Sequence, residues 1–128
     1  MVDVANVMGA RADGWWRDRA GAAQRLCDEV TAVARRGDGP AAAWVLVLEG
    51  RARDAARQLR DEAPDGTAVP VRVVSAPASG DDAIVGVVAE VTGEAESCLV
   101  VTADRELRRR CEALGAAVVG PGWLLRLL

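Results

Sequence analysis

Four aspartates occupy positions from which their carboxylates could act together. Asp3 lies in the apolar opening segment, Asp81 and Asp82 are adjacent, and Asp104 closely follows the apolar run 98–102. Clustered carboxylates with no basic residue among them repel one another, so they need a cation. All-oxygen ligands without His or Cys suit Mg²⁺ or Mn²⁺. The four aspartates therefore predict a divalent-metal site, in which Asp82 or Asp104 could orient an attacking water.

Each aspartate also has an ordinary structural interpretation. Asp104 directly precedes a predicted helix over 105–114, and Asp is a favoured N-cap. Asp3 could be an exposed residue at a frayed terminus, and a helix dipole would favour both Asp81 and Asp82 at a helix start. One aspartate would suffice for capping there. The recurrence of acids at equivalent strand–helix junctions is what favours a shared site.

The residues that are missing exclude several kinds of chemistry. The sequence has no His and no Lys, and all 16 basic residues are Arg. A Ser-His-Asp triad, a His-ligated metal, a Walker P-loop and a Schiff base are therefore impossible. Cys27, Cys98 and Cys111 are too far apart in the sequence to indicate a disulfide framework or a zinc site. Metal-assisted hydrolysis stays possible because it requires no His base.

Two adjacent tryptophans in the loop 9–17 suggest a nucleic-acid surface. Trp15 and Trp16 stand beside Arg11 and Arg17, and aromatic rings stack on bases while Arg pairs with phosphates. The alternative is structural: one Trp closes the core and the other covers a neighbouring helix. Both interpretations stay open.

Further arginines follow Asp104 directly. Arg105 and Arg108 are the first of several, and from this position they could hold phosphates or stabilise charge in a transition state. The alternative is that they form a solvated helix face.

Apolar runs and breakers predict the elements that would carry these residues. Strands are expected at five segments: 1–4, 44–48, 71–75, 98–102 and 116–119. Helices are expected between and after them: 18–36, 51–63, 83–91, 105–114 and a short one from Pro121. Strict alternation predicts a single α/β domain over 1–128, with a central five-stranded parallel sheet in a three-layer αβα arrangement. The strands that precede Asp104 and contain Asp3 should be adjacent at its centre.

The sequence indicates a cytoplasmic protein without a membrane segment. The opening residues lack a basic region before an apolar one, and the longest apolar run, 41–48, is far shorter than the roughly 20 residues that span a bilayer.

Three motifs resemble those of the NYN domain, a ribonuclease family related to the PIN nucleases. They are VDVANVMG at 2–9, GDDAIV at 80–85 and VVTADREL at 100–107, in the family's order. The resemblance covers essentially the whole chain. It implies a compact Rossmann-like, PIN/NYN-like sheet whose acids bind Mg²⁺ or Mn²⁺ and cleave RNA.

The motif positions imply roles for individual residues. Asp3, Asp81 or Asp82, and Asp104 correspond to metal ligands, and Asn6 to a residue that orients a ligand or the scissile phosphate. Many active relatives carry a further acid one helical turn after the Asp104 position. This chain has Arg108 there, a departure that bears on whether two metals could bind.

The residues and the resemblance together predict a metal-dependent ribonuclease acting on RNA, with single-stranded RNA as the expected partner. Two alternatives stay open: hydrolysis of a nucleoside triphosphate by the same acids, or an inactive module that binds RNA or protein. Arg108 favours these alternatives, whereas the full set of Asp3, Asn6, Asp82 and Asp104 opposes the inactive one. A homo-oligomer also stays open.

Overall fold

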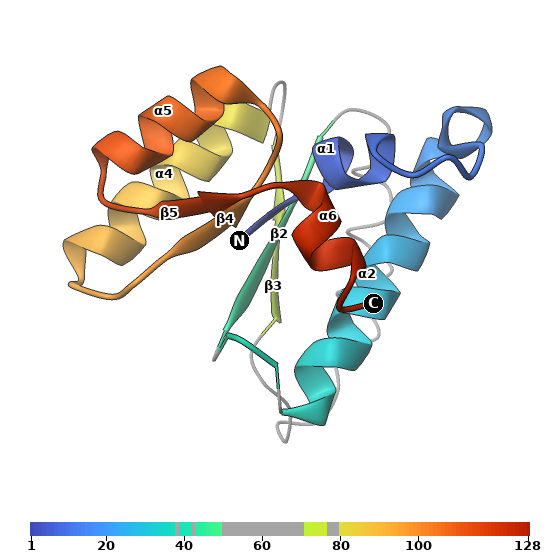
Figure 1. The fold of residues 1–128 in the computed structure, drawn as a ribbon, viewed down its shortest axis with the longest axis horizontal. Helices are drawn as coiled ribbons and strands as arrows, with labels where there is room; N and C mark the ends of the chain where they lie inside the picture. Colours follow the sequence, from blue (N-terminus) through green and yellow to red (C-terminus); the bar gives the residue numbers. More distant parts are fainter. Residues whose placement is uncertain (38, 42, 50–70, 77–79) are drawn as a thin grey trace.

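A computed structural model describes residues 1–37, 39–41, 43–49, 71–76 and 80–128. In these residues five strands form one all-parallel sheet in the order β3-β2-β1-β4-β5 (Figure 1). They are β1 (Val2–Asp3), β2 (Trp44–Leu48), β3 (Val71–Ser75), β4 (Leu99–Val101) and β5 (Ala117–Val119). Because β1 pairs with both β2 and β4, the prediction that the strands before Asp104 and around Asp3 are adjacent at the centre is confirmed.

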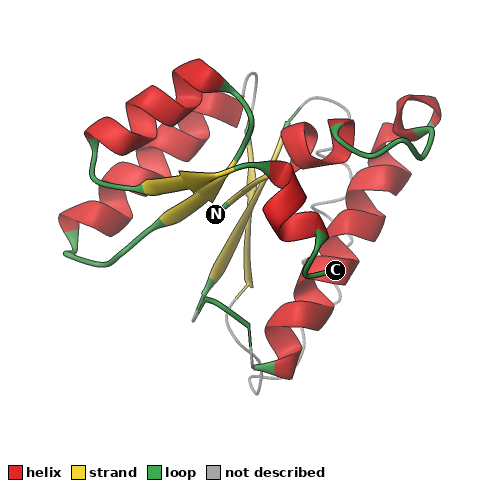
Figure 2. Ribbon diagram, viewed as in Figure 1, coloured by secondary structure: helices red, strands yellow, loops and turns green. Residues whose placement is uncertain are grey.

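Helices cover both faces of the sheet (Figure 2). The described helices are α1 (Val4–Gly9), η1 (Trp15–Arg17), α2 (Arg19–Arg36), α4 (Gly80–Gly93), α5 (Arg105–Ala113) and α6 (Pro121–Leu125). One hydrophobic cluster joins the sheet to α1, α2 and α6, and another joins it to α4 and α5. The arrangement is the predicted three-layer α/β fold.

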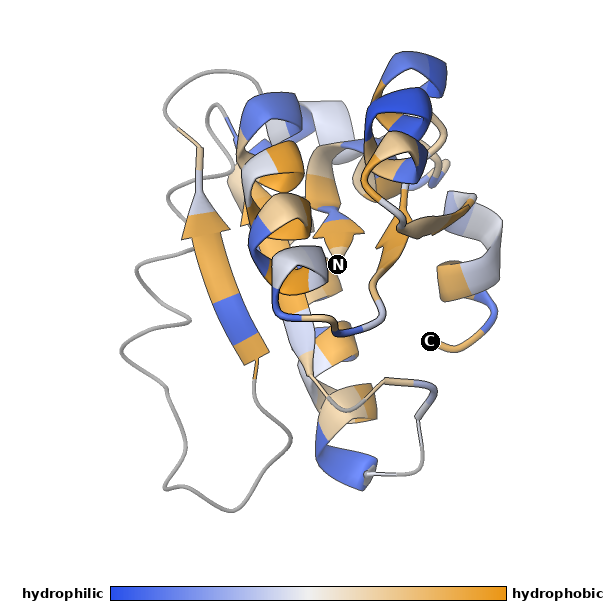
Figure 3. Ribbon diagram, turned by 90° about the vertical axis from the view of Figure 1, so that its left-hand side faces the viewer, coloured by the Kyte–Doolittle hydropathy of each residue, from blue (hydrophilic) through white to orange (hydrophobic). Residues whose placement is uncertain are grey.

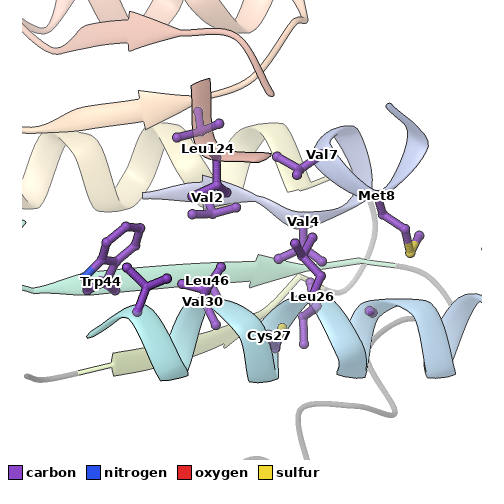
Figure 4. Close-up of a cluster of buried hydrophobic side chains, with 14 of the residues drawn as sticks. Val2, Val4, Val7, Met8, Leu26, Cys27, Val30, Trp44, Leu46 and Leu124 are labelled. Carbon is purple, nitrogen blue, oxygen red and sulfur yellow. The ribbon is translucent and has the colours of Figure 1, made fainter. Parts of the chain in front are cut away.

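Burial on both faces explains why the interior strand β2 is apolar throughout. Leu46 and Leu48 of β2 belong to the cluster against α2, whereas Val47 between them belongs to the cluster against α4 and α5. Successive side chains of a strand point to opposite faces, so a strand covered on both faces has no position for a polar residue. Figure 4 shows the α2-side cluster, where Leu26 and Val30 of α2 approach the sheet.

The longest described helix illustrates how the local sequence sets the helix ends. Asp18 accepts a hydrogen bond from the backbone N–H of Gly21 and caps the start of α2. Gly37 ends it at a φ of 72°, a left-handed conformation that costs Gly little. The helices carry both hydrophilic and hydrophobic residues (Figure 3). Within the described ranges, no helix is long and apolar enough to cross a membrane.

The structure corrects one predicted element at the amino end. The sequence predicts a strand over 1–4 and a loop over 9–17. In the structure β1 ends at Asp3, α1 covers Val4–Gly9 and η1 covers Trp15–Arg17. Val4, Val7 and Met8 are buried on one side of α1, a helical spacing within a short β-branched segment. Helix α4 begins at Gly80, three residues before the expected start. The helix expected at 51–63 lies outside the described residues.

Candidate active site

The strand order places a topological switch point between β1 and β4. The chain proceeds from β1 to β2 and β3 on one side, and β4 and β5 lie on the other. Ligands of open parallel sheets bind outside the carboxyl ends of the strands at such a reversal. Asp3 is the last residue of β1, and Thr102 directly follows β4. The predicted aspartate positions therefore flank the switch point.

Asp3 is a buried carboxylate. It is 7% exposed, Thr102 Oγ1 donates to its Oδ2 at 3.0 Å, and the backbone N–H of Asn6 donates to its Oδ1 at 3.4 Å. Both hydrogen bonds favour the charged form, but burial outweighs them, and the negative charges of Glu49 and Asp81 act in the same direction as burial. Together they raise the pKa of Asp3 to about 6. The alternative of an exposed residue at a frayed terminus is wrong.

Thr102 and Asn6 hold the loop between β4 and α5. Thr102 Oγ1 accepts a hydrogen bond from the backbone N–H of Asp104 at 3.2 Å, in addition to donating to Asp3. Asn6 Oδ1 accepts from the backbone N–H of Ala103 at 2.7 Å. Sequence reasoning did not single out Thr102. Its signal is a hydroxyl at the carboxyl end of an apolar run.

Asp104 caps α5, as the structural interpretation predicts. Its Oδ1 accepts hydrogen bonds from the backbone N–H groups of Glu106 and Leu107, both at 3.0 Å. Both capping bonds go to the same oxygen, so capping does not use Oδ2. A cap and a ligand are therefore compatible roles for this side chain.

The two adjacent aspartates of α4 have different surroundings. The Asp82 side chain is 85% exposed and accepts a hydrogen bond from Arg110 Nη2 at 2.9 Å. The pKa of Asp81 is raised by partial burial, then by the charges of Asp104 and Glu49, with Arg110 opposing them. The geometry thus favours Asp81 over Asp82 as the aspartate that meets the other acids.

Glu49 joins the acids at this edge, although sequence reasoning set it aside. Its carboxylate accepts a hydrogen bond from the backbone N–H of Gly80, so it connects the end of β2 to the start of α4. A Cβ at Gly80 would lie 2.8 Å from Glu49 Oε2, so a larger residue there would require the Glu49 carboxylate to shift. The sequence already places Glu49 at a strand end, followed by an Arg-rich segment that could pair with it, but that segment (51–63) lies outside the described residues. The position of Glu49 at the carboxyl end of a strand was the available signal.

These acids offer the oxygen ligands that a hard cation prefers, but they do not form a complete set of ligands around one point. Among the residues that the structure describes, no three His, Cys, Asp or Glu side chains are grouped closely enough to hold a metal ion. Mg²⁺ commonly binds through one or two carboxylates and retains several waters. Asp3 and Asp81, whose charges repel each other, are the two candidate carboxylates for such a site.

Two of the predicted substrate-binding arginines are engaged elsewhere. Arg11 Nη2 lies 2.5 Å from Glu29 Oε2 of α2. Arg108 Nε lies 2.6 Å from Glu112 Oε1, one turn along α5. These contacts favour the solvated-face interpretation for Arg108.

Arg110, rather than Arg108, is the α5 arginine close to the acids, so the expectation that no basic residue lies among the aspartates is wrong at Asp82. Its hydrogen bond to Asp82 raises its pKa, and the charges of Asp82, Asp81 and Glu106 act in the same direction. It therefore stays positively charged. Arg105 is exposed at the start of α5.

The two tryptophans of η1 also differ. Trp15 is partly buried and packs against the α2-side cluster, as the structural alternative predicts. Trp16 is 58% exposed.

No family model matches this chain, and searches of curated proteins and of solved structures likewise found no match.

Proposed function

We propose that this chain is a divalent-metal-dependent ribonuclease with a PIN/NYN-like domain, hydrolysing RNA phosphodiester bonds at the carboxyl edge of β1 and β4. One observation carries the proposal. Asp3 is a buried carboxylate whose pKa is raised to about 6, and the negative charges of Glu49 and Asp81 repel its own. Burying repelling charges destabilises a fold unless a cation compensates them. The order of the three NYN-like motifs supports the choice of RNA.

The residues at this edge have distinct roles in the proposal. Asp3 and Asp81 hold the cation, and Asp104 offers Oδ2 to orient the attacking water. The positive charge of Arg110 stabilises the negative charge that develops on the phosphate in the transition state. Thr102 links Asp3 to the Asp104 backbone, because its hydroxyl donates to the Asp3 carboxylate and accepts from the Asp104 N–H. The cation, when bound, lowers the pKa of a water and polarises the phosphate.

Thermal melts with and without Mn²⁺ test the metal site. Added Mn²⁺ should stabilise the parent, by about 2.7 kcal/mol at a concentration 100 times Kd. Asp81→Asn should lose most of this stabilisation because it removes a ligand. Asp82→Asn is the matched control, since it lies in the same helical turn but its side chain contacts Arg110, and it should retain the Mn²⁺ shift. If Mn²⁺ leaves the melting temperature of the parent unchanged, the proposed metal site is ruled out.

A parallel activity screen tests the reaction. Single-stranded RNA, structured RNA and the common nucleoside triphosphates are incubated with the parent and Mn²⁺ or Mg²⁺. Divalent-dependent cleavage of single-stranded RNA is expected, and Asp104→Asn should abolish it while costing at most about 1 kcal/mol of stability, because Asn caps nearly as well as Asp. Turnover of triphosphates alone would establish the nucleotide hydrolase instead.

An inactive binding module is the second candidate. It is favoured by Arg108, which stands where active NYN relatives carry an acid and pairs with Glu112. The described acids also lack a three-ligand group. RNA binding without cleavage of any substrate in the screen would establish this candidate.

A further inference from the structure

The short helix η1 presents one tryptophan to solvent and anchors the other. Gly14 precedes it with a φ of 75°, a left-handed conformation suited to Gly. Trp15 packs on the core, and a Cβ at Gly9 would lie 4.0 Å from its Cζ2. The Trp16 ring meets Trp15 edge-on, with 6.0 Å between centroids and 86° between planes. Trp15 thus supports an exposed ring in a defined orientation.

Two guanidinium groups accompany these rings. Arg17 lies 5.9 Å from the Trp16 ring centroid, and Arg19 lies 5.3 Å from that of Trp15. Neither arginine belongs to any of the ion pairs found in the described residues. Trp16 stays 58% exposed even with Arg17 and Trp15 beside it. An accessible ring with neighbouring guanidinium groups can bind a flat aromatic group linked to an anion.

The position of this surface connects it to the acids. Asp3 caps the start of α1, and Trp15 lies against Gly9 at the other end of that helix. Six residues of helix span roughly 9 Å. A strand bound at the acidic edge could therefore extend along α1 to η1.

We infer that Trp16, supported by Trp15 and flanked by Arg17 and Arg19, is a stacking platform for an unpaired base of single-stranded nucleic acid. The inference extends the proposed function by assigning a substrate-binding site outside the acidic edge. Asp13 and Asp18 lie on either side of the two tryptophans in the sequence, and their negative charges offset those of Arg17 and Arg19. Stacking should therefore contribute more to the affinity than charge does. A duplex hides the faces of its bases, so it should bind poorly.

Fluorescence anisotropy with a labelled oligoribonucleotide of about 10 nucleotides tests the platform. Binding is measured in EDTA, where metal-dependent cleavage cannot occur. Trp16→Ala should weaken binding roughly fivefold to 150-fold, the usual range for loss of one stacked base. Trp16→Phe should retain much of the affinity because it keeps a π-face. Leu114→Ala, at another exposed apolar residue, is the control and should leave binding unchanged.

An abasic strand of the same length separates stacking from charge. It keeps every phosphate but offers no base, so Trp16→Ala should have no effect on its binding. Arg17→Gln should instead reduce the slope of log affinity against log salt by about 0.7 on either strand. Circular dichroism melts of each variant verify that it is folded.

Two outcomes would overturn the platform: equal affinities of the folded parent and Trp16→Ala for the normal strand, or tighter binding of duplex than of single strand. Because binding is measured without divalent ions, its result does not depend on whether the chain hydrolyses RNA. Cleavage with an intact Trp16→Ala affinity would refute the platform alone, whereas stacking without cleavage in the metal screen would refute the ribonuclease alone.

Discussion

Burial of Asp3 makes the stability of the fold depend on pH. Its pKa is about 6 in the folded chain and about 3.9 when unfolded. The folded state therefore binds more protons between these values. The favourable contribution is complete below about pH 4 and is lost as pH rises through about 6, a change of about 3 kcal/mol.

Replacing Asp3 with Asn should remove this dependence. Asp3→Asn stays neutral, so its free energy of unfolding, relative to that of the parent, should rise by about 3 kcal/mol from about pH 4 to about pH 7. Urea unfolding without divalent cations measures both curves. Asp13→Asn, at an exposed position, controls for the loss of one carboxylate. Parallel curves for the parent and Asp3→Asn would show that Asp3 titrates alike in both states.

The sequence could locate the acids more readily than it could choose between Asp81 and Asp82. Consecutive helical residues point about 100° apart, so only one of the two can face the edge of the sheet. An amphipathic helix would reveal which, but α4 is apolar nearly all round and its sequence does not define a buried face. The choice depends on the packing of α4 against α5, which brings Arg110 to Asp82. Glu49 was recognisable as an acid at a strand end, but its contact with Gly80, 31 residues along the chain, depends on tertiary packing and could not be predicted.

At the scale of elements, α1 and the β4–α5 loop are joined by one side chain. Asn6 Oδ1 accepts the hydrogen bond of the Ala103 backbone N–H at 2.7 Å. Asn6→Ala should destabilise the fold by about 0.5–1.5 kcal/mol, because this hydrogen bond is exposed and water can replace the lost acceptor. Hydrogen exchange measured by NMR should show faster exchange at Ala103. The Leu107 amide, held by Asp104, is the internal control and should keep its protection. Unchanged exchange at Ala103 would contradict the role of Asn6.

Long apolar segments were predictable at this scale, and the short helix α1 was not. Strands β2 and β3 have the predicted bounds, 44–48 and 71–75. Helix α1 has only six residues, too few to be stable by propensity alone. It forms because Asp3 caps it and because Val4 and Val7 are buried in the core. That burial depends on tertiary packing, which the apolar opening residues do not by themselves distinguish from a strand.

At the scale of the whole molecule, the two hydrophobic clusters share one sheet. Leu26 lies on the α2 side and Leu107 on the α5 side, and both are almost fully buried. Leu26→Ala and Leu107→Ala should each cost about 2–5 kcal/mol. If 1–128 is a single domain, either variant should unfold in one transition with the urea dependence of the parent. Two separate transitions in either variant would contradict a single domain.

The central place of β1 also determines when the acids can meet. The hydrogen bond from Thr102 to Asp3 spans 99 residues. A ribosome that adds about 5–20 residues per second makes Asp3 roughly 5–20 s before Thr102. Throughout that interval the growing chain lacks Thr102, the loop that Asn6 holds and Asp104. Every shorter nascent chain therefore carries Asp3 without Thr102 and Asp104, and the acidic edge can assemble only after residue 104 has been made.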